Sequence, residues 1–312
     1  MDERAGDTTS TTTRPLDGRV AVVTGASRGA GRGIALELGA AGATVYVTGR
    51  STRAAPATTA NSRYGTILEQ SGMTVMPGTI DDTADEVTRL GGTGVAVRCD
   101  HTEDDEVRAL FARVEDEQGR LDVLVNNAWG GHETFDLANF SAPFWEQPLD
   151  QWDGMFTHGV RNHVVASRRA APLLVRQGRG LIVTTTFWDR GAYLTGNLFY
   201  DLAKATMTRL AFAVAEELRP HGVASVALSP GWMRTELVLA SQHTDEAHWR
   251  DHPALARTES TRYVGRAVVA LAGDPDVLAR SGDVLLVGDL AREYGFTDVD
   301  GRVVPPFALE RG

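Results

Sequence analysis

Short apolar segments rich in β-branched residues alternate along this chain with longer segments whose apolar residues recur at helical spacing. Buried strands are predicted at 19–23, 43–48, 94–98, 121–125, 181–186, 223–228 and 283–287, and helices at 34–41, 104–117, 151–175 and 200–218. Alternating strands and helices form a parallel sheet with helices on both faces. The pattern therefore predicts a single α/β domain built on a Rossmann-like, doubly wound sheet of about seven strands.

Several segments lie outside this minimal plan. Residues 1–15 are polar and lack the apolar core of a signal peptide, so we expect a disordered tail before a domain spanning 16–312. Residues 51–81 form too long a connection for an ordinary loop and predict an insertion over the surface. Residues 236–261 predict a lid over a substrate, and residues 289–312 a C-terminal extension.

The composition narrows the class of function. The chain has 312 residues, of which 42% are hydrophobic, and its net charge of −10 argues against nucleic acid as a main partner. No apolar run approaches the ~20 residues of a membrane span, so no membrane partner is expected. Cys99 is the single cysteine, which suits a reducing compartment, and a cytoplasmic location is expected. The eight histidines lack metal-ligand spacing, so no metal site is predicted.

A glycine cluster at 24–31 joins the first predicted strand to the first predicted helix. Its glycines are Gly25, Gly29 and Gly31. They permit a tight turn and a close approach to a pyrophosphate, whose charge a helix N-terminus attracts. The second strand ends at Arg50, where an NAD site needs a carboxylate for the ribose 2′-hydroxyl. Together with Arg28, Arg50 predicts a site for the 2′-phosphate of NADP(H). The alternative is that both arginines are solvated surface charges.

Tyr200 and Lys204 lie four residues apart in a predicted helix and therefore share a face. Reducing a carbonyl requires a proton at oxygen as well as a hydride at carbon, and a tyrosine can supply the proton if its pKa moves toward neutral pH. The lysine cation favours tyrosinate and is expected to lower that pKa. Such a pair is common by chance, so the alternative is a Tyr and a Lys on a partly exposed helix.

By their sequence and their order along the chain, these motifs resemble those of the short-chain dehydrogenase/reductase family over roughly residues 16–290. The resemblance implies a cofactor site made of Gly25, Ser27, Arg28, Gly29, Gly31, Asp100, Asn127, Ala128, Tyr200, Lys204, Pro230, Gly231 and Thr235. In it Asp100 binds adenine, Thr235 binds the nicotinamide carboxamide and Lys204 also binds the nicotinamide ribose. Residues 42–50 and 289–302 further resemble the branch called dehydrogenase/reductase family member 1 and its bacterial relatives.

One departure from the family pattern concerns the substrate oxygen. The family's serine for this oxygen aligns with Phe187, which has no hydroxyl. Thr186 is expected to take its role, with Thr184 on the same strand face and Thr185 pointing away. The alternative is that these threonines are simply good strand formers.

A second departure concerns proton relay. The family's relay asparagine aligns with Gly159, which has no side chain, so a water or an exposed carbonyl would have to replace it. Asn162 and His163 lie about one helical turn further on and are further candidates.

Aromatic residues near predicted strand ends favour a bulky apolar substrate pocket; they are Trp129, Phe144, Trp145, Phe187, Trp188, Tyr193 and Trp232. The sequence therefore predicts an NADP(H)-dependent oxidoreductase that interconverts a small, apolar or aromatic carbonyl and its alcohol. Tyr200 would be the acid/base, Lys204 would tune it and Thr186 would bind the substrate oxygen. The resemblance also implies a homodimer or homotetramer. Rival hypotheses are a weakly catalytic NADPH-binding sensor or scaffold, and a non-redox dehydratase or epimerase.

Overall fold

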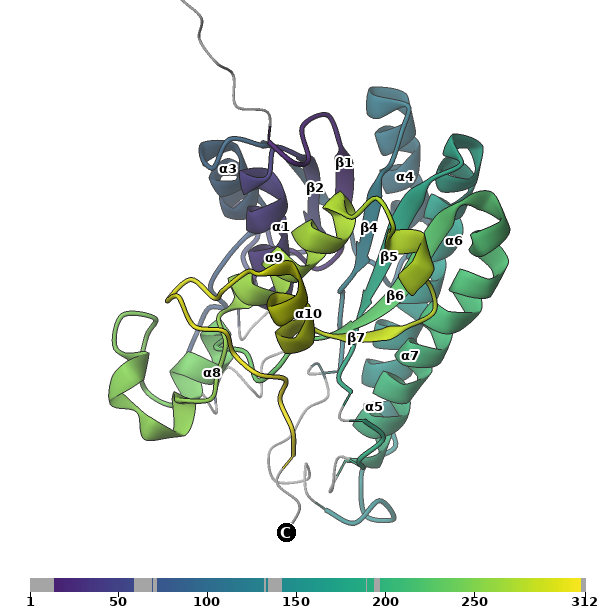
Figure 1. Cartoon of the computed structure of the whole chain (residues 1–312). Coiled ribbons are helices and arrows are strands. Elements are labelled where there is room, and N and C mark those ends of the chain that lie inside the picture. Colours follow the sequence, from purple (N-terminus) through teal and green to yellow (C-terminus); the bar gives the residue numbers. More distant parts are fainter. Residues whose placement is uncertain are drawn as a thin grey trace, which may run out of the picture.

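A single parallel sheet forms the centre of the molecule (Figure 1). The computed structural model describes residues 14–58, 69, 72–131, 133, 142–188, 190–193 and 197–309. Within these residues the strands run in the order β3-β2-β1-β4-β5-β6-β7. Their bounds are β1 Val20–Val23, β2 Thr44–Gly49, β3 Thr93–Arg98, β4 Val123–Asn126, β5 Gly180–Thr185, β6 Val223–Ser229 and β7 Val284–Leu286. The predicted Rossmann-like sheet is confirmed, and its strand order reverses between β1 and β4, where such sheets bind ligands.

Helices cover both faces of the sheet. They are α1 Gly29–Ala40, α3 Ile80–Arg89, α4 Asp104–Gln118, α5 Asp150–Trp152, α6 Arg161–Gln177, α7 Leu198–Leu218, α8 Glu236–Ser241, α9 Thr261–Gly273 and α10 Val287–Tyr294. Successive side chains of a strand point to opposite faces. In β1, Ala21 and Val23 accordingly join the apolar cluster that α1, α3 and α9 complete. Val20 and Val22 join the cluster that α4, α6 and α7 complete.

The helix predicted at 151–175 is interrupted by a wider turn. A π-helical segment, Asp153–Val160, lies between α5 and α6. It contains two buried glycines, Gly154 and Gly159. Such π segments inside helices are rare and occur frequently at functional sites. Here the segment packs against the N-terminal half of α7 and reaches the site described below.

The segments predicted outside the minimal plan are described only in part. Residues 1–13 of the predicted tail lie outside the described residues, as does part of the predicted insertion. The last residues of that insertion already belong to α3, because the Thr79 side chain accepts a hydrogen bond from the Asp82 amide and caps the helix. The predicted lid consists of α8 and two short 3-10 turns, Trp249–Asp251 and Pro253–Leu255.

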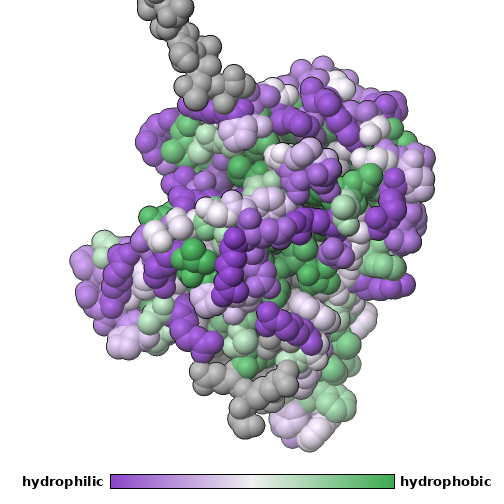
Figure 2. Space-filling model, in the orientation of Figure 1, coloured by the Kyte–Doolittle hydropathy of each residue, from purple (hydrophilic) through white to green (hydrophobic). Residues whose placement is uncertain are grey.

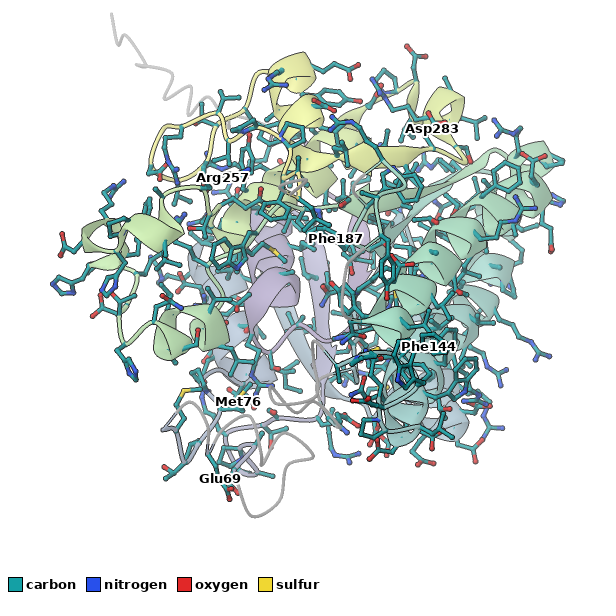
Figure 3. The ribbon with its side chains drawn as sticks, turned by 90° about the horizontal axis from the view of Figure 1, so that it is seen from below. Glu69, Met76, Phe144, Phe187, Arg257 and Asp283 are labelled. Atoms are coloured by element: carbon teal, nitrogen blue, oxygen red, sulfur yellow. The ribbon has the colours of Figure 1, made fainter. Side chains whose placement is uncertain are left out.

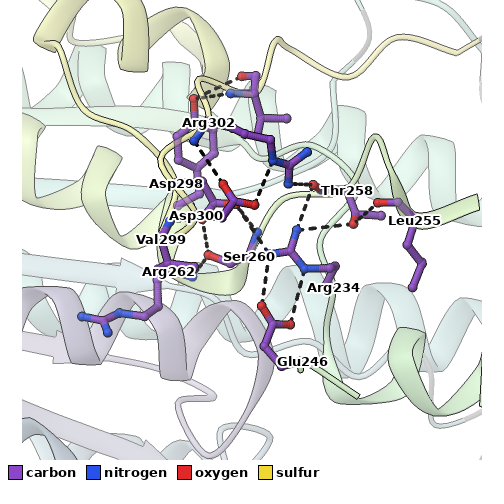
Figure 4. A network of polar contacts seen from close by, with 12 residues as sticks. Arg234, Glu246, Leu255, Thr258, Ser260, Arg262, Asp298, Val299, Asp300 and Arg302 are labelled. Carbon is purple, nitrogen blue, oxygen red and sulfur yellow. Dashed lines mark hydrogen bonds and ion pairs between the residues drawn. The ribbon is translucent and has the colours of Figure 1, made fainter. Parts of the chain in front are cut away.

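A buried arginine connects this segment to the C-terminal extension (Figure 4). The Arg234 guanidinium is fully buried, 3.1 Å from a Glu246 carboxylate oxygen and 3.7 Å from an oxygen of Asp298. It donates a hydrogen bond to the Thr258 carbonyl at 2.9 Å and lies over the Trp249 ring. Because Asp298 is also buried, the pair fixes residues 236–260 against residues 298–302.

Hydrophilic residues dominate the face of the molecule shown in Figure 2, with smaller hydrophobic areas between them. None of the helices in the described ranges has the length and apolar composition that crossing a bilayer requires.

Candidate active site

A cavity of about 660 Å³ lies at the carboxyl ends of the strands. Phe187 lies near the middle of the view from below, between Arg257 and Phe144 (Figure 3). The predicted site residues that line the cavity are Gly25, Ser27, Arg28, Gly29, Arg50, Asp100, Asn127, Ala128, Thr186, Tyr200, Lys204, Pro230, Gly231 and Thr235. Of the predicted set, Gly31 alone is not among the lining residues. A Cβ at Gly31 would lie 2.3 Å from the Gly25 carbonyl oxygen, so this glycine allows the loop to pack on α1.

The glycine loop is held against β4. Gly25 has φ +66°, and a Cβ there would lie 2.8 Å from Cα of Ala128. The Asn127 side-chain amide donates to the carbonyl oxygens of Thr24 at 3.0 Å and Gly25 at 3.1 Å. This arrangement keeps the N-terminus of α1 open toward the cavity, where backbone N–H groups attract anions.

An acidic side chain already contacts that helix N-terminus. The Gly29 amide donates to a carboxylate oxygen of Glu236 at 3.0 Å. Glu236 is the first residue of α8 and lines the cavity. Thr235 lines the cavity as expected, and its hydroxyl accepts a hydrogen bond from the Val238 amide, which caps α8.

The predicted 2′-phosphate site is more acidic than the sequence indicated. Arg50 Nη2 lies 2.6 Å from a carboxylate oxygen of Glu133, and Nη1 lies 3.8 Å from one of Asp100. Glu133 also lies 3.2 Å from His158 Nδ1. The Arg28 guanidinium donates to Ser51 Oγ at 2.9 Å and to backbone carbonyls of the insertion. Both arginines therefore reach the cavity, but neither is a simple solvated charge.

The structure brings Tyr200 and Lys204 together in the first turns of α7. The Asn197 side chain accepts a hydrogen bond from the Tyr200 amide at 2.8 Å and so sets where the helix begins. Lys204 Nζ lies 3.8 Å from the ring centroid of Trp129 and 5.3 Å from that of Tyr200. Burial lowers the pKa of Lys204 to about 7.

The expected lowering of the Tyr200 pKa is wrong for this arrangement. Burial raises the pKa of the Tyr200 hydroxyl instead, because the protein around it disfavours the charged phenolate. The Lys204 ammonium lies over the Trp129 ring rather than beside this hydroxyl. Tyr200 is accordingly protonated at neutral pH, the form in which it can donate a proton.

Thr186 follows β5 and lines the cavity, as expected, but its hydroxyl proton is engaged elsewhere. Thr186 Oγ1 donates to the Lys204 carbonyl oxygen at 3.0 Å. The expectation that Thr184 shares its face and Thr185 points away is wrong: Thr185 lines the cavity, while Thr184 is buried within the sheet. The cause is that β5 ends at Thr185, so the strand alternation no longer holds at Thr186. The Thr186 oxygen remains able to accept a hydrogen bond.

Among the described residues, neither candidate for the relay asparagine is hydrogen-bonded to Tyr200 or Lys204, although Asn162 lines the cavity. The Asn162 amide donates to the His158 carbonyl at 2.6 Å, while its buried Oδ1 has no hydrogen-bond partner among the described residues. His163 Nε2 lies 3.0 Å from the Ala128 carbonyl oxygen, and burial lowers the pKa of His163 to about 3. His163 thus supports the loop after β4 as a neutral imidazole.

Aromatic residues form one wall beside Tyr200. The Phe187 ring lies 6.4 Å from the Tyr200 ring and 6.1 Å from the Phe307 ring. Of the other predicted aromatic residues, Trp129 lines the cavity, whereas Phe144 and Trp145 are 56% and 72% exposed and contact each other. The contact of Phe307 with Phe187 was not predicted, because the C-terminal extension carries no periodic pattern that would place Phe307.

A second missed signal was readable in the composition. Lys204 is the only lysine of the whole chain, because 30 of its 31 basic residues are arginines. Every other basic residue counted here is an arginine, so the lysine at position 204 indicates that an ammonium group is needed there. Arg and Lys differ in size, hydration and ease of deprotonation.

Known proteins share this sequence and architecture. A family model described as enoyl-(acyl carrier protein) reductase matches residues 64–287. Dehydrogenase/reductase SDR family member 1 of Homo sapiens is 42% identical over 301 residues, covering 94% of this chain and 87% of the relative. A short chain dehydrogenase of Mycobacterium thermoresistibile has a similar crystal structure, with a TM-score of 0.74, 27% identity and 95% coverage of each chain. A hydroxysteroid dehydrogenase from Escherichia coli has a TM-score of 0.66 at 27% identity, covering 87% of this chain and 96% of that one.

Proposed function

Because the chain belongs to the short-chain dehydrogenase/reductase family, we propose that it is an NADP(H)-dependent oxidoreductase that interconverts a carbonyl and an alcohol. One observation carries the proposal: Tyr200 and Lys204 line the same cavity as the glycine loop. A proton donor and a dinucleotide cradle in one cavity are what hydride transfer to a carbonyl requires.

The residues present fit a dinucleotide. Gly25 has φ +66° and lines the cavity, so the loop presents bare backbone that a pyrophosphate could approach closely. The contact of Gly29 with the Glu236 carboxylate supports an anion position at the N-terminus of α1. Gly25, Ser27 and Gly29 would hold the pyrophosphate, Asp100 the adenine, and Pro230, Gly231 and Thr235 the nicotinamide. The cofactor, when bound, supplies or accepts the hydride.

Arg28 and Arg50 support NADP(H) over NAD(H). Both guanidinium groups reach the cavity near the end of β2, where a 2′-phosphate would lie. Glu133 and Asp100 flank Arg50 and would compete with the phosphate for it. The preference for NADP(H) is therefore expected to be moderate, with Arg28 sharing the charge.

Tyr200 is proposed to move the proton. Its raised pKa keeps the hydroxyl protonated at neutral pH, so it acts as the acid when the substrate is a carbonyl. In the reverse direction the base would be the phenolate, which the raised pKa disfavours. Lys204 would orient the ribose. Thr186 Oγ1, whose proton is donated to the Lys204 carbonyl, would accept a hydrogen bond from an alcohol substrate.

The aromatic wall supports an apolar or aromatic substrate. Phe187 presents ring surface beside Tyr200 and is backed by Phe307, and apolar walls with few polar groups are typical of small-molecule sites. A hydroxysteroid dehydrogenase among the similar structures also favours a bulky apolar carbonyl. We further propose a homodimer or homotetramer, to be measured by light scattering coupled to size-exclusion chromatography.

The proposal is tested by following NADPH oxidation over a panel of apolar ketones, quinones and aldehydes, with NADH in parallel. Turnover that is faster with NADPH supports it. Tight NADPH binding without turnover favours a sensor or scaffold. Product formation without net cofactor consumption favours a dehydratase or epimerase.

A further inference from the structure

The Trp129 side chain contacts both residues of the proposed catalytic pair. Its ring centroid lies 3.8 Å from Lys204 Nζ, close enough for a strong cation–π interaction. The same ring meets Tyr200 edge-to-face, with 5.9 Å between centroids and an 87° angle between planes. One aromatic side chain from the loop after β4 thus contacts two groups of α7 that stand one helical turn apart.

Two glycines leave the space that the indole ring occupies. A Cβ at Gly159, in the π segment, would lie 2.9 Å from Cζ3 of Trp129 and 3.0 Å from Cε3. A Cβ at Gly131 would lie 2.1 Å from Cζ2. Real Cβ atoms essentially never approach other atoms this closely, so a side chain at either position would displace the ring. The absence of a side chain at Gly159 is therefore matched by the presence of a large one at Trp129.

Lys204 has few other groups to stabilise its charge. Apart from the two rings, Lys204 Nζ contacts Met207 Sδ at 3.9 Å, and no carboxylate of the described residues pairs with it. The titratable groups that face it are Tyr200 on α7 and His163 on α6, and the charge of Lys204 is one cause of the lowered pKa of His163. The π face of Trp129 is thus the main favourable partner of a partly buried ammonium.

We propose that Trp129 is a positioning residue for Lys204, whose ring holds the ammonium group in place and favours its charged form, and that Gly159 is required because it admits that ring. The role of Lys204 in turnover rests on the proposed function, whereas its contact with Trp129 does not. In this chain an aromatic face therefore stands where the relay asparagine of the family would lie.

The single lysine makes a direct test possible. Full-length protein labelled with ¹⁵N-lysine has one side-chain Nζ signal, whose pH titration measures the pKa of Lys204 without cofactor or substrate. Replacing Trp129 by Leu keeps an apolar neighbour but removes the π face. The pKa of Lys204 is expected to fall by about one unit in Trp129→Leu and by less in Trp129→Phe, because the phenyl face attracts a cation more weakly.

A matched cycle tests the glycine. Gly159→Ala is expected to shift the Lys204 pKa and Nζ signal in the wild-type background, where the ring is displaced, and to change neither in the Trp129→Leu background. Phe187→Leu is the control, since that ring contacts Tyr200 and not Lys204. An unchanged or raised Lys204 pKa in both Trp129 variants would overturn the proposal, as would an equal Gly159→Ala shift in both backgrounds.

Turnover separates this inference from the proposed function. Tyr200→Phe should abolish carbonyl reduction while leaving the effect of Trp129 on the Lys204 titration intact. If Trp129→Leu fails to fold, the Trp129→Phe titration is sufficient. A lowered Lys204 pKa in that variant supports the proposal, and an unchanged or raised pKa contradicts it.

Discussion

Removing the charge of Glu236 should strengthen cofactor binding. The Glu236 carboxylate accepts a hydrogen bond from the Gly29 amide at 3.0 Å, at the N-terminus of α1 where a pyrophosphate is proposed to bind. Two like charges about 4 Å apart repel each other by about 1 kcal/mol in a fully solvated site, and by about 4 kcal/mol at the effective dielectric of a protein surface. Glu236 is partly exposed and begins a short helix, so its side chain can turn toward solvent, and the lower value applies.

Glu236→Gln should therefore lower the Kd for NADPH about 5-fold, since about 1 kcal/mol corresponds to that factor. Titration calorimetry on the full chain measures it, and the gain should shrink in high salt. Glu216→Gln, on the exposed side of α7, is the control with the same change in net charge. An equal gain in both variants would reduce the effect to net charge, and an unchanged or weaker Kd for Glu236→Gln would show that the pyrophosphate does not bind at this helix terminus.

Other predictions concern the cofactor, the substrate and stability. Arg50→Leu should reduce kcat/KM for NADPH about 10-fold and leave kcat/KM for NADH nearly unchanged. Equal losses with both cofactors would contradict a contact between Arg50 and the 2′-phosphate. Thr186→Val should reduce kcat/KM for alcohol oxidation about 10-fold, because the acceptor for the substrate hydroxyl is lost; a change within twofold would end its assigned role. His101 lies 2.9 Å from Thr48 Oγ1, and burial lowers the pKa of His101 to about 4. As the pH falls below about 6.5, His101 therefore takes up a proton in the unfolded chain before it does so in the folded protein. The free energy of unfolding is expected to decrease by about 2 kcal/mol between pH 6.5 and pH 5 for this reason. Urea unfolding at these two pH values should show a smaller difference in His101→Gln, and an unchanged difference would contradict the assignment.

The strands were predictable because each is a short, almost wholly apolar run. The first, predicted at 19–23, is observed as Val20–Val23, and its alternate residues pack into the two helical layers. Because helices cover both faces of a parallel sheet, nearly every residue of its strands must be apolar. The glycine turn between β1 and α1 was likewise predictable, because a tight turn between strand and helix leaves a local glycine pattern.

Contacts between distant segments were not predictable in this way. The π segment Asp153–Val160 was predicted only as part of a long helical stretch with small irregularities, since hydrophobic periodicity does not resolve one wide turn. The contact of Glu236 with Gly29 joins residues 207 positions apart. The meeting of Trp129, Gly159 and Lys204 depends on how β4, the π segment and α7 pack together, and each residue alone gives no sign of the others.

The central claim is that Tyr200 transfers the proton during NADPH-dependent carbonyl reduction. The most direct measurement compares the rate of NADPH oxidation, with the best ketone of the panel, for the wild-type protein and Tyr200→Phe, after showing that both bind NADPH equally. A loss of at least about 100-fold in kcat with unchanged NADPH affinity is predicted, because general acid catalysis contributes at least that factor. Equal rates for the two proteins would contradict the claim.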